Sequence, residues 1–287
     1  MDFEELQRLV NQQMQEQNNR GIADFQGYSP NEMKQILYHT FSESSPLQMK
    51  QLSKTDYDKV PLLNQIKYLA KLLQEKGQIK LTNKGFLPTK IVADLYGQGF
   101  IKDDSIESKI SKLYKETDSL SVHLTHILLE ISGIAKKRKG VLSLTKSGEK
   151  LIADDDKLLR QLFEVFATKF NWAYFDAYED NGMGQKGFGF TLILLAKYGE
   201  VNRLNSFYAE KYFKAFPYLL EDLVPGYTTA EEYAANCYSL RTFDRFLSYF
   251  GIIKIEQKGR GFDRMKYIAK TPLFDKMIAC APPQARK

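Results

Sequence analysis

Basic side chains gather at two places in the chain where the local sequence predicts a turn between short strands. Ten of them form the candidate nucleic-acid-binding set: Lys136, Lys137, Arg138, Lys139, Arg241, Arg245, Lys258, Arg260, Arg264 and Lys266. Lysine and arginine bind phosphate oxygens, and arginine also pairs with the edge of guanine. The first four lie at the tip of one predicted hairpin. The other six combine two arginines, one helical turn apart, with a second predicted hairpin, so both groups indicate contact with DNA.

The excess positive charge of the chain is confined to its C-terminal part. The whole sequence has 41 Lys/Arg and 35 Asp/Glu, and residues 239–287 alone hold 11 basic and 4 acidic residues. The rest of the chain, with 30 basic and 31 acidic residues, is close to neutral. Charge collected on one element favours nucleic-acid contact more than the same charge spread evenly. We therefore expect the C-terminal part to be the main binding surface.

Three carboxylates near the middle of the chain are candidates for metal-dependent chemistry. Asp176, Glu179 and Asp180 share one face if the segment is helical. Paired carboxylates bind metal ions or carry out acid–base catalysis. The sequence has no histidine close to them, so a solvated helix end is the favoured interpretation and a metal-dependent hydrolase the less favoured one.

His123 and His126 are three residues apart on a predicted helix. As metal ligands they lack a cysteine or carboxylate at matching spacing. Polar residues at the edge of a packed helix are the favoured interpretation. Cys237 and Cys280 likewise lack the partners of a nucleophile.

The stretch Gly182-Met183-Gly184-Gln185-Lys186-Gly187 has the glycine spacing of a dinucleotide-binding loop. Such a loop needs a preceding strand and a helix N-terminus directed at phosphate. Here the preceding residues predict helix, and nearby carboxylates would repel phosphate. A loop between helices is the favoured interpretation, and the sequence predicts no catalytic residues, no metal and no cofactor.

The elements that must position these side chains follow one repeated order. Residues 61–76 have the apolar spacing of a helix, Pro61 suits its first turn and Gly77 its end. Residues 79–81 alternate like a short strand, and Thr82 is expected to cap the next helix. Helix, turn, strand and capped helix form the order of a winged-helix unit, in which a hairpin follows the helix that enters the DNA groove.

Two further copies of this order are expected. In the second, residues 120–131 form the helix, 134–135 begin a strand and 141–145 return from the basic tip. In the third, 241–250 form the helix, 252–256 the strand and 267–271 the return. Thr82, Thr145 and Thr271 stand at the equivalent ends of the three copies, which hints at a further degenerate copy between the last two.

The remaining segments are predicted to be helical. Residues 1–25 form a polar helix that docks on the body or on a partner, and Ser29-Pro30-Asn31-Glu32 is a capping box that opens a helix to about His39. The aromatic spacing from Leu158 to Tyr178 predicts a long helix buried on more than one side. The expected parts are an N-terminal arm at 1–60, winged-helix-like modules at 61–104 and 105–156, the aromatic-rich helical segment at 157–225, and a basic winged-helix-like module at 226–287.

Composition narrows the class of protein. The chain has 287 residues, 43% of them apolar, which suffices for a substantial core. No run of 18 uncharged apolar residues and no secretion signal is present, so we expect no membrane partner. Two cysteines predict a reducing compartment, and hence a cytoplasmic protein.

Three motifs resemble those of a family of uncharacterised bacterial proteins. They are Ser29-Pro30-x-Glu32-Met33, Lys80-Leu81-Thr82-x-Lys84-Gly85-x-Leu87-Pro88 and Phe170-Asn171-Trp172-Ala173-Tyr174-Phe175-Asp176. The resemblance spans roughly residues 28–200 and implies a helical, winged-helix-like body without an established activity. Some members carry a cysteine-rich, zinc-binding SEC-C tail. Cys280 stands alone near the end of this chain, so a zinc role is not implied here.

These observations predict a mainly α-helical protein with short β-hairpins, built from tandem winged-helix-like modules around a helical, aromatic-rich centre. The leading functional hypothesis is non-enzymatic DNA binding, including a regulatory role, through the ten basic residues. The alternative is a protein-interaction or scaffold role with the aromatic segment as the docking core. A metal-dependent hydrolase ranks third.

Overall fold

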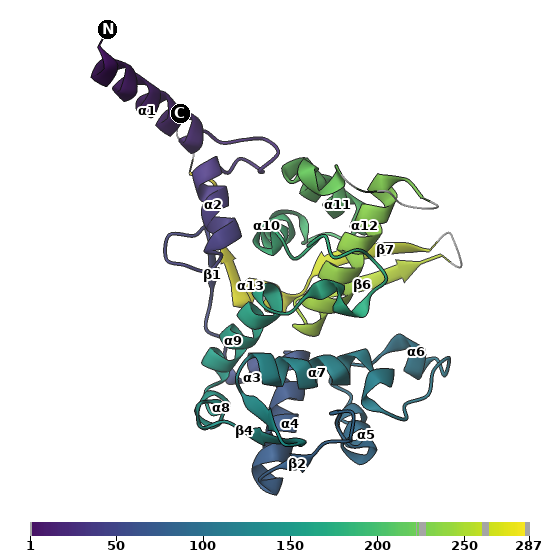
Figure 1. Ribbon diagram of the computed structural model, residues 1–287. Coiled ribbons are helices and arrows are strands. Elements are labelled where there is room, and N and C mark those ends of the chain that lie inside the picture. Colours follow the sequence, from purple (N-terminus) through teal and green to yellow (C-terminus); the bar gives the residue numbers. More distant parts are fainter. Residues whose placement is uncertain (1, 222, 224–227, 260–263, 285–287) are drawn as a thin grey trace. The chain divides into compact units, whose positions relative to one another are not determined.

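The computed structural model of the protein describes residues 2–221, 223, 228–259 and 264–284. These residues are mainly α-helical with short antiparallel strands, which confirms the predicted fold class (Figure 1). The chain divides into two compact units. Unit 1 comprises residues 1–50, 181–244 and 253–287, and unit 2 comprises residues 51–180 and 245–252. None of the described helices is long and apolar enough to cross a membrane.

Unit 2 is a set of helices with a three-stranded sheet. Its elements in chain order are α3 (Lys54–Tyr57), α4 (Pro61–Lys76), β2 (Ile79–Lys80), α5 (Thr89–Gly97), α6 (Asp104–Glu107), α7 (Leu120–Ile131), β3 (Ala135–Arg138), β4 (Val141–Leu144), α8 (Lys146–Leu151) and α9 (Asp155–Thr168). The sheet order is β2-β4-β3, with Ile79 opposite Leu142 and Arg138 opposite Val141. The strand expected in residues 61–104 and the hairpin expected in residues 105–156 therefore belong to one sheet.

Unit 1 contains two small sheets. Its elements are α1 (Phe3–Asn19), α2 (Pro30–Tyr38), β1 (Leu47–Met49), α10 (Phe188–Tyr198), β5 (Arg203–Leu204), α11 (Asn205–Ala215), α12 (Ala230–Ser239), β6 (Ile253–Lys258), β7 (Met265–Lys270), α13 (Pro272–Met277) and β8 (Ile278–Cys280). Strand β1 pairs with β8, and the other sheet has the order β5-β7-β6. The capping box predicted at the start of α2 is present, with Ser29 and Glu32 bonded in both directions.

The two units contain the same succession of elements. Apart from the four-residue helix α6 and short 3₁₀ turns, helix, strand, helix, helix, strand and strand appear as α4-β2-α5-α7-β3-β4 in unit 2 and as α10-β5-α11-α12-β6-β7 in unit 1. In both sheets the last strand lies between the other two. A short helix follows each last strand, and Thr145 and Thr271 are the N-cap residues of these helices. The sequence repeat at these two threonines thus corresponds to a repeat of the whole six-element arrangement.

Thr82 differs from the other two threonines. Its hydroxyl accepts the backbone N–H of Phe86 at 3.0 Å and closes a turn, whereas the next helix, α5, begins at Thr89 after Pro88. The expectation that Thr82 caps this helix was wrong. Pro88 explains the delay, because the residue before a proline is disfavoured in helical backbone geometry.

The aromatic segment of unit 2 is shorter as a helix than predicted. Helix α9 ends at Thr168, and Trp172–Phe175 form a separate 3₁₀ turn that Asn171 caps through its side chain. The indole N–H of Trp172 donates to the carbonyl of Phe166 at 2.7 Å. The π-helical stretch Leu240–Leu247 continues α12 and passes from unit 1 into unit 2, where the Phe246 ring packs edge-on against Phe163 and tilted against Trp172.

Candidate nucleic-acid interface

The basic tip between β3 and β4 is a two-residue hairpin loop. Lys139 and Gly140 both have left-handed backbone geometry, with φ of 50° and 72°. Two such residues form the turn whose twist matches that of the flanking strands. The N–H of Leu81 donates to the carbonyl of Gly140 at 2.8 Å, so the chain after β2 holds the tip in place.

The register of the sheet places cations from two strands on one face. Lys80, Val141 and Arg138 lie in one cross-strand row, and Lys136 lies two residues along β3 from Arg138. Directly paired residues and residues two apart share a face. Neighbouring strands are about 4.8 Å apart, so Lys80 and Arg138 lie about 10 Å from each other at the backbone. This distance leaves room for two phosphate contacts side by side.

Lys137 points to the opposite face and links the hairpin to the turn before α5. Its Nζ donates to the carbonyl of Gly85 at 3.2 Å. Gly85 has φ of 83°, and a β-carbon there would lie 2.2 Å from Nζ, so glycine allows this close approach. Lys84 directly precedes Gly85 in the same turn.

We call six cations the basic wing: Lys80, Lys84, Lys136, Lys137, Arg138 and Lys139. All six are exposed. Within the described residues none of them forms an ion pair, although many other basic side chains in the chain do. Their charge is therefore not neutralised locally and faces solvent.

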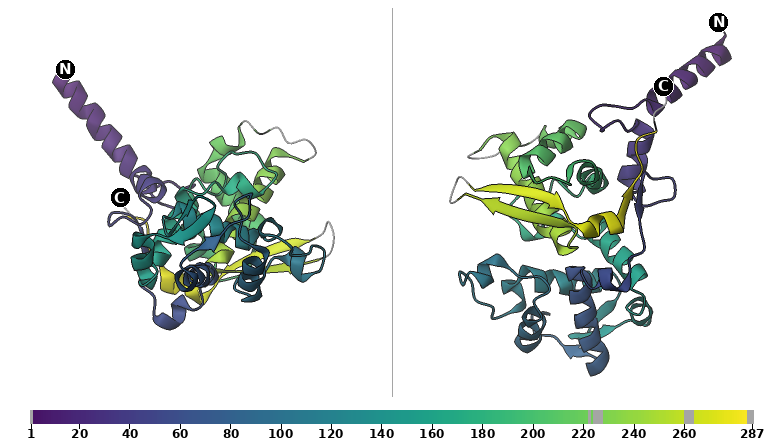
Figure 2. Two further views of the ribbon diagram at one scale, coloured as in Figure 1. Left: turned by 60° about the horizontal axis from the view of Figure 1, so that its bottom comes forward. Right: turned by 180° about the vertical axis from the view of Figure 1, so that it is seen from behind.

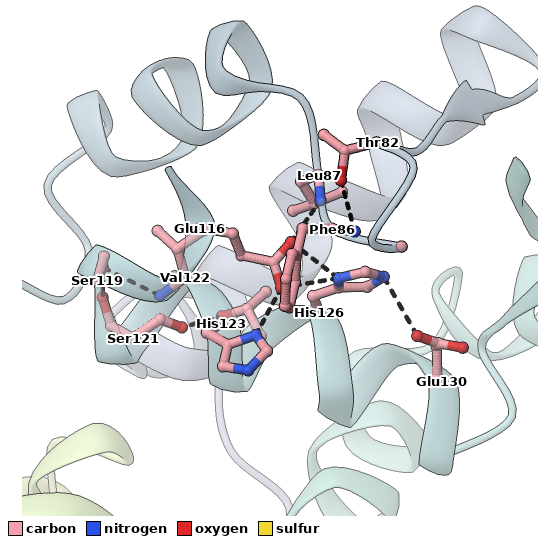
Figure 3. Close-up of polar contacts among 12 residues, drawn as sticks. Thr82, Phe86, Leu87, Glu116, Ser119, Ser121, Val122, His123, His126 and Glu130 are labelled. Atoms are coloured by element: carbon pink, nitrogen blue, oxygen red, sulfur yellow. Dashed lines mark hydrogen bonds and ion pairs between the residues drawn. The ribbon is translucent and has the colours of Figure 1, made fainter. Parts of the chain in front are cut away.

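A buried carboxylate holds the turn next to the basic wing against α7 (Figure 3). Glu116 is completely buried, and its carboxylate accepts the Leu87 N–H at 2.5 Å. It also lies 2.5 Å from Nδ1 of His123 and 2.9 Å from Nδ1 of His126. An ionised carboxylate only accepts hydrogen bonds, so each Nδ1 carries a proton. Glu116 thus joins the 82–87 turn to two positions of α7.

The pKa of Glu116 reflects opposing effects. Burial alone would raise the pKa, but the hydrogen bonds from His123 and His126 outweigh it and lower the pKa from 4.5 to about 2. On its other side, His126 Nε2 lies 3.2 Å from the Glu130 carboxylate, without a well-aligned hydrogen bond between them. The carboxylate of Glu116 is therefore charged at neutral pH and shielded from water.

Aromatic rings enclose the outer side of this cluster. The His123 ring lies edge-on to Phe86 and Phe175, and Tyr174 lies next to it. The motif that includes Tyr174 and Phe175 therefore packs onto α7. His123 is 12% exposed and lies at the edge of the packed helix as expected, whereas His126 is buried and does not. Sequence reasoning missed Glu116 as their partner, because nothing in the spacing marks it.

Helix α7 is mostly covered by its own unit. Its buried residues are Ser121, Val122, Leu124, Thr125, His126, Leu128 and Leu129. A helix that reads base edges must present long polar side chains to the major groove. Of the unit's elements, the hairpin rather than α7 presents such side chains to solvent.

Two arginines of the predicted C-terminal set have structural roles. Arg241 is 1% exposed and donates to Asn181 Oδ1 at 2.9 Å. Arg245 donates to the Phe175 carbonyl at 2.8 Å and lies 3.5 Å from the buried carboxylate of Asp176. Both were predicted to contact nucleic acid, but the structure places them against the protein. Each has a carboxamide or carboxylate partner about 60 to 70 residues away in sequence, which no local pattern reveals.

The hairpin residues of this set are partly neutralised. Lys266 pairs with Asp244 and also donates to Ser239, and Lys258 lies 3.3 Å from Glu256. Arg264 is exposed. Arg260 lies outside the described residues. The local excess of positive charge in the sequence therefore does not become a continuous surface of free cations among the described residues.

The three carboxylates that were candidates for metal-dependent chemistry do not form a shared site. Asp176 pairs with Arg245, Asp180 accepts from Asn171 at 2.9 Å, and the three carboxylates follow the 3₁₀ turn rather than sharing a helical face. The described residues contain no group of three or more His, Cys, Asp or Glu that could hold a metal ion. The assumption that the three carboxylates share one helical face was therefore wrong.

The glycine-rich stretch before α10 is held by a tyrosine. The buried Tyr212 hydroxyl accepts the Gly184 N–H at 3.1 Å and donates to the Lys186 carbonyl. A β-carbon on Gly187 would lie 2.7 Å from the Phe216 ring. No strand precedes the loop among the described residues of this segment, so it is not a dinucleotide-binding loop of the expected kind, and its glycines allow close packing where a flexible loop was expected.

The comparisons with known proteins concern unit 2. Residues 58–157 match the family model described as the Y4jL N-terminal domain, an uncharacterised family. The matched stretch includes α4 to β4 and every residue of the basic wing. No curated protein and no solved structure matches the chain.

Proposed function

We propose that unit 2 binds the phosphate backbone of DNA through the basic wing. The observation that carries this proposal is the set of six exposed cations without an ion pair among the described residues. The order of elements in the unit is consistent with a winged helix, which supports the proposal, and its β2-β4-β3 sheet includes a short hairpin with a two-residue turn. Such a hairpin can follow a phosphate backbone without entering a groove.

The proposed contact is largely independent of base sequence. Phosphate contacts supply affinity and position, whereas base-edge contacts supply specificity. Helix α7 buries most of its surface inside unit 2, so it has few side chains to offer to base edges. We expect binding that is strong at low salt, falls steeply with rising salt and varies little between duplex sequences.

The experiment compares two triple variants of the full chain with the same loss of charge. Lys80→Gln/Lys136→Gln/Arg138→Gln removes the cations on one face of the sheet. Lys71→Gln/Lys102→Gln/Lys157→Gln removes three exposed lysines of the same unit that have carboxylate partners. Binding of a labelled random duplex at low salt should weaken at least about tenfold in the first variant and less than about twofold in the second. Equal losses in both, or no binding by the wild type, would overturn the proposal.

A protein-interaction role is the second candidate, and one observation favours it. Helix α1 carries large apolar side chains that are all exposed. The aromatic segment is a weaker docking surface than expected, because Phe163, Phe166 and Trp172 are buried in unit 2. An interaction role therefore rests on α1.

A further inference from the structure

Helix α1 leaves an entire apolar stripe open to solvent. Its five large apolar side chains are Phe3, Leu6, Leu9, Val10 and Met14, with exposed fractions between 45% and 77%. None of the residues of α1 is buried. The C-terminal end of the helix is held by α2, where Asn31 donates to Asn19 at 3.0 Å. Figures 1 and 2 show the rest of α1 extending away from α2.

The exposed apolar face of α1 would be stabilised by packing against another surface. α1 has 17 residues, only slightly more than the length of about 12 to 15 below which isolated helices are marginal in water even with alanine-rich sequences. A stripe of apolar residues at helical spacing gains stability when another surface removes it from water. The described residues provide no such surface along the stripe.

We propose that α1 pairs in parallel with α1 of a second copy of this chain as a short coiled coil. In a heptad numbered from Phe3, the core positions a and d are Phe3, Leu6, Val10, Gln13 and Gln17. Each of these would face its own counterpart on the second helix. Three apolar layers are then followed by two glutamine layers, and polar core layers set the register of a coiled coil at a cost in stability.

The flanking positions fit the same arrangement. Leu9 falls at position g and Met14 at the next position e, and these positions face each other across a parallel pair. All five exposed apolar side chains would therefore be covered at once. The charged residues Glu4, Glu5 and Arg8 fall at the outer positions b, c and f and stay in solvent.

The parallel direction follows from the layers. An antiparallel pair matches each a position with a d position, so Phe3 would face Gln13 of the second copy at both ends. In the parallel pair Phe3 faces Phe3, and Gln13 can hydrogen-bond to Gln13. Matching apolar with apolar layers avoids the cost of leaving an amide without a partner.

The second copy suits the stripe better than a charged partner does. The e and g positions flank the core positions of the heptad. Those before Glu16 within α1 are occupied by the neutral residues Gln7, Leu9 and Met14. A neutral border selects for a self-complementary, two-fold interface rather than for an oppositely charged surface. Two such helices would bury on the order of 1,000 Å² in total, the lower end for a specific interface, so we expect a reversible dimer.

The first test measures the mass of the full chain in solution as a function of concentration. The wild type should shift from monomer to dimer with rising concentration in sedimentation equilibrium. Leu6→Gln/Val10→Gln should raise the dimer dissociation constant at least tenfold, whereas the control Glu4→Gln/Arg8→Gln should change it less than twofold. Because α1 has no buried residue, these substitutions leave the folded units intact. A monomer at every concentration, or equal effects of both variants, would overturn the proposal.

The second test reads the direction of pairing from disulfide formation. In a Cys280→Ser background, Leu6→Cys should link to itself under diamide oxidation in the parallel pair. Asn11→Cys, at the outer position b, should not link. If Leu6→Cys links only to a copy that carries Val10→Cys, the helices are antiparallel and the proposed parallel pair is wrong.

Discussion

Glu116 is the side chain whose removal should affect unit 2 most specifically. In Glu116→Gln the side-chain size is nearly unchanged, but the negative charge between two histidines is lost. The amide oxygen can still accept hydrogen bonds from one or two of Leu87, His123 and His126, but its NH₂ group would face another donor. All three contacts therefore lose the charge of the acceptor, and at least one hydrogen bond is lost altogether.

The size of the effect follows from these contacts. A hydrogen bond to a charged group contributes about 1.5–3 kcal/mol, and Glu116 accepts such bonds from three residues. We expect the free energy of unfolding of unit 2 to fall by about 3–5 kcal/mol. For a unit of this size the melting temperature should fall by about 10 °C or more.

Trp172 makes this loss measurable in unit 2 alone. It is the single tryptophan of the chain, it lies in unit 2 and it is buried. Its fluorescence during urea denaturation should report the unfolding of this unit. The control is Glu75→Gln, which removes an exposed carboxylate 3.8 Å from Lys71 and should change the free energy by less than about 0.5 kcal/mol. If Glu116→Gln lowers the stability no more than Glu75→Gln, the buried cluster does not hold the 82–87 turn as described.

Three further predictions concern pH, an arginine and a glycine. The pKa of Glu116 is lowered from 4.5 to about 2 in the folded protein, so its ionised carboxylate contributes about 3 kcal/mol to the free energy of unfolding above pH 4.5. This contribution is lost as the pH falls toward 2. The urea midpoint measured by Trp172 fluorescence should therefore fall over this pH range, and it should fall less in Glu116→Gln. Arg245→Gln removes the cation beside the buried carboxylate of Asp176, so the same fluorescence assay should show that the free energy of unfolding falls by about 3 kcal/mol. Arg264 is exposed, and Arg264→Gln should leave this free energy unchanged. Equal effects of the two substitutions would contradict the assigned roles. In Gly187→Ala the added methyl group meets the Phe216 ring in a backbone region that favours glycine, so the free energy of unfolding of unit 1 should fall by about 1–3 kcal/mol. Calorimetry should show a lower melting temperature for unit 1 and an unchanged one for unit 2. Gly97→Ala, with open space around it, is the control.

Local elements of the fold were predictable because their signals lie within a few residues. The bounds of α4 and α7 agree with the apolar spacing of 61–76 and 120–131, and the capping box at Ser29 is formed as predicted. The pairing of β2 with β4 was not predictable. Strand β2 has two residues, and its partner lies about sixty residues later, beyond the reach of any periodic pattern.

The same limit applies to the candidate site. Among the ten basic residues, the run at 136–139 is exposed and without ion pairs in the described chain, whereas Arg241 is buried. Local charge counts cannot separate these cases, because a distant Asn181 or Asp176 decides whether an arginine faces solvent or protein. Lys80 and Lys84 were left out of the candidate set for a related reason, since only the sheet register brings Lys80 beside Arg138.

The most direct test of the proposed function is the salt dependence of duplex binding. Each phosphate contact adds about 0.9 to the slope of log K against log salt concentration. Lys80→Gln/Lys136→Gln/Arg138→Gln should therefore reduce the slope of the wild type by about 2 to 3, on several unrelated duplex sequences alike. A slope that is the same in wild type and variant would show that the basic wing does not contact phosphate, and would contradict the proposal.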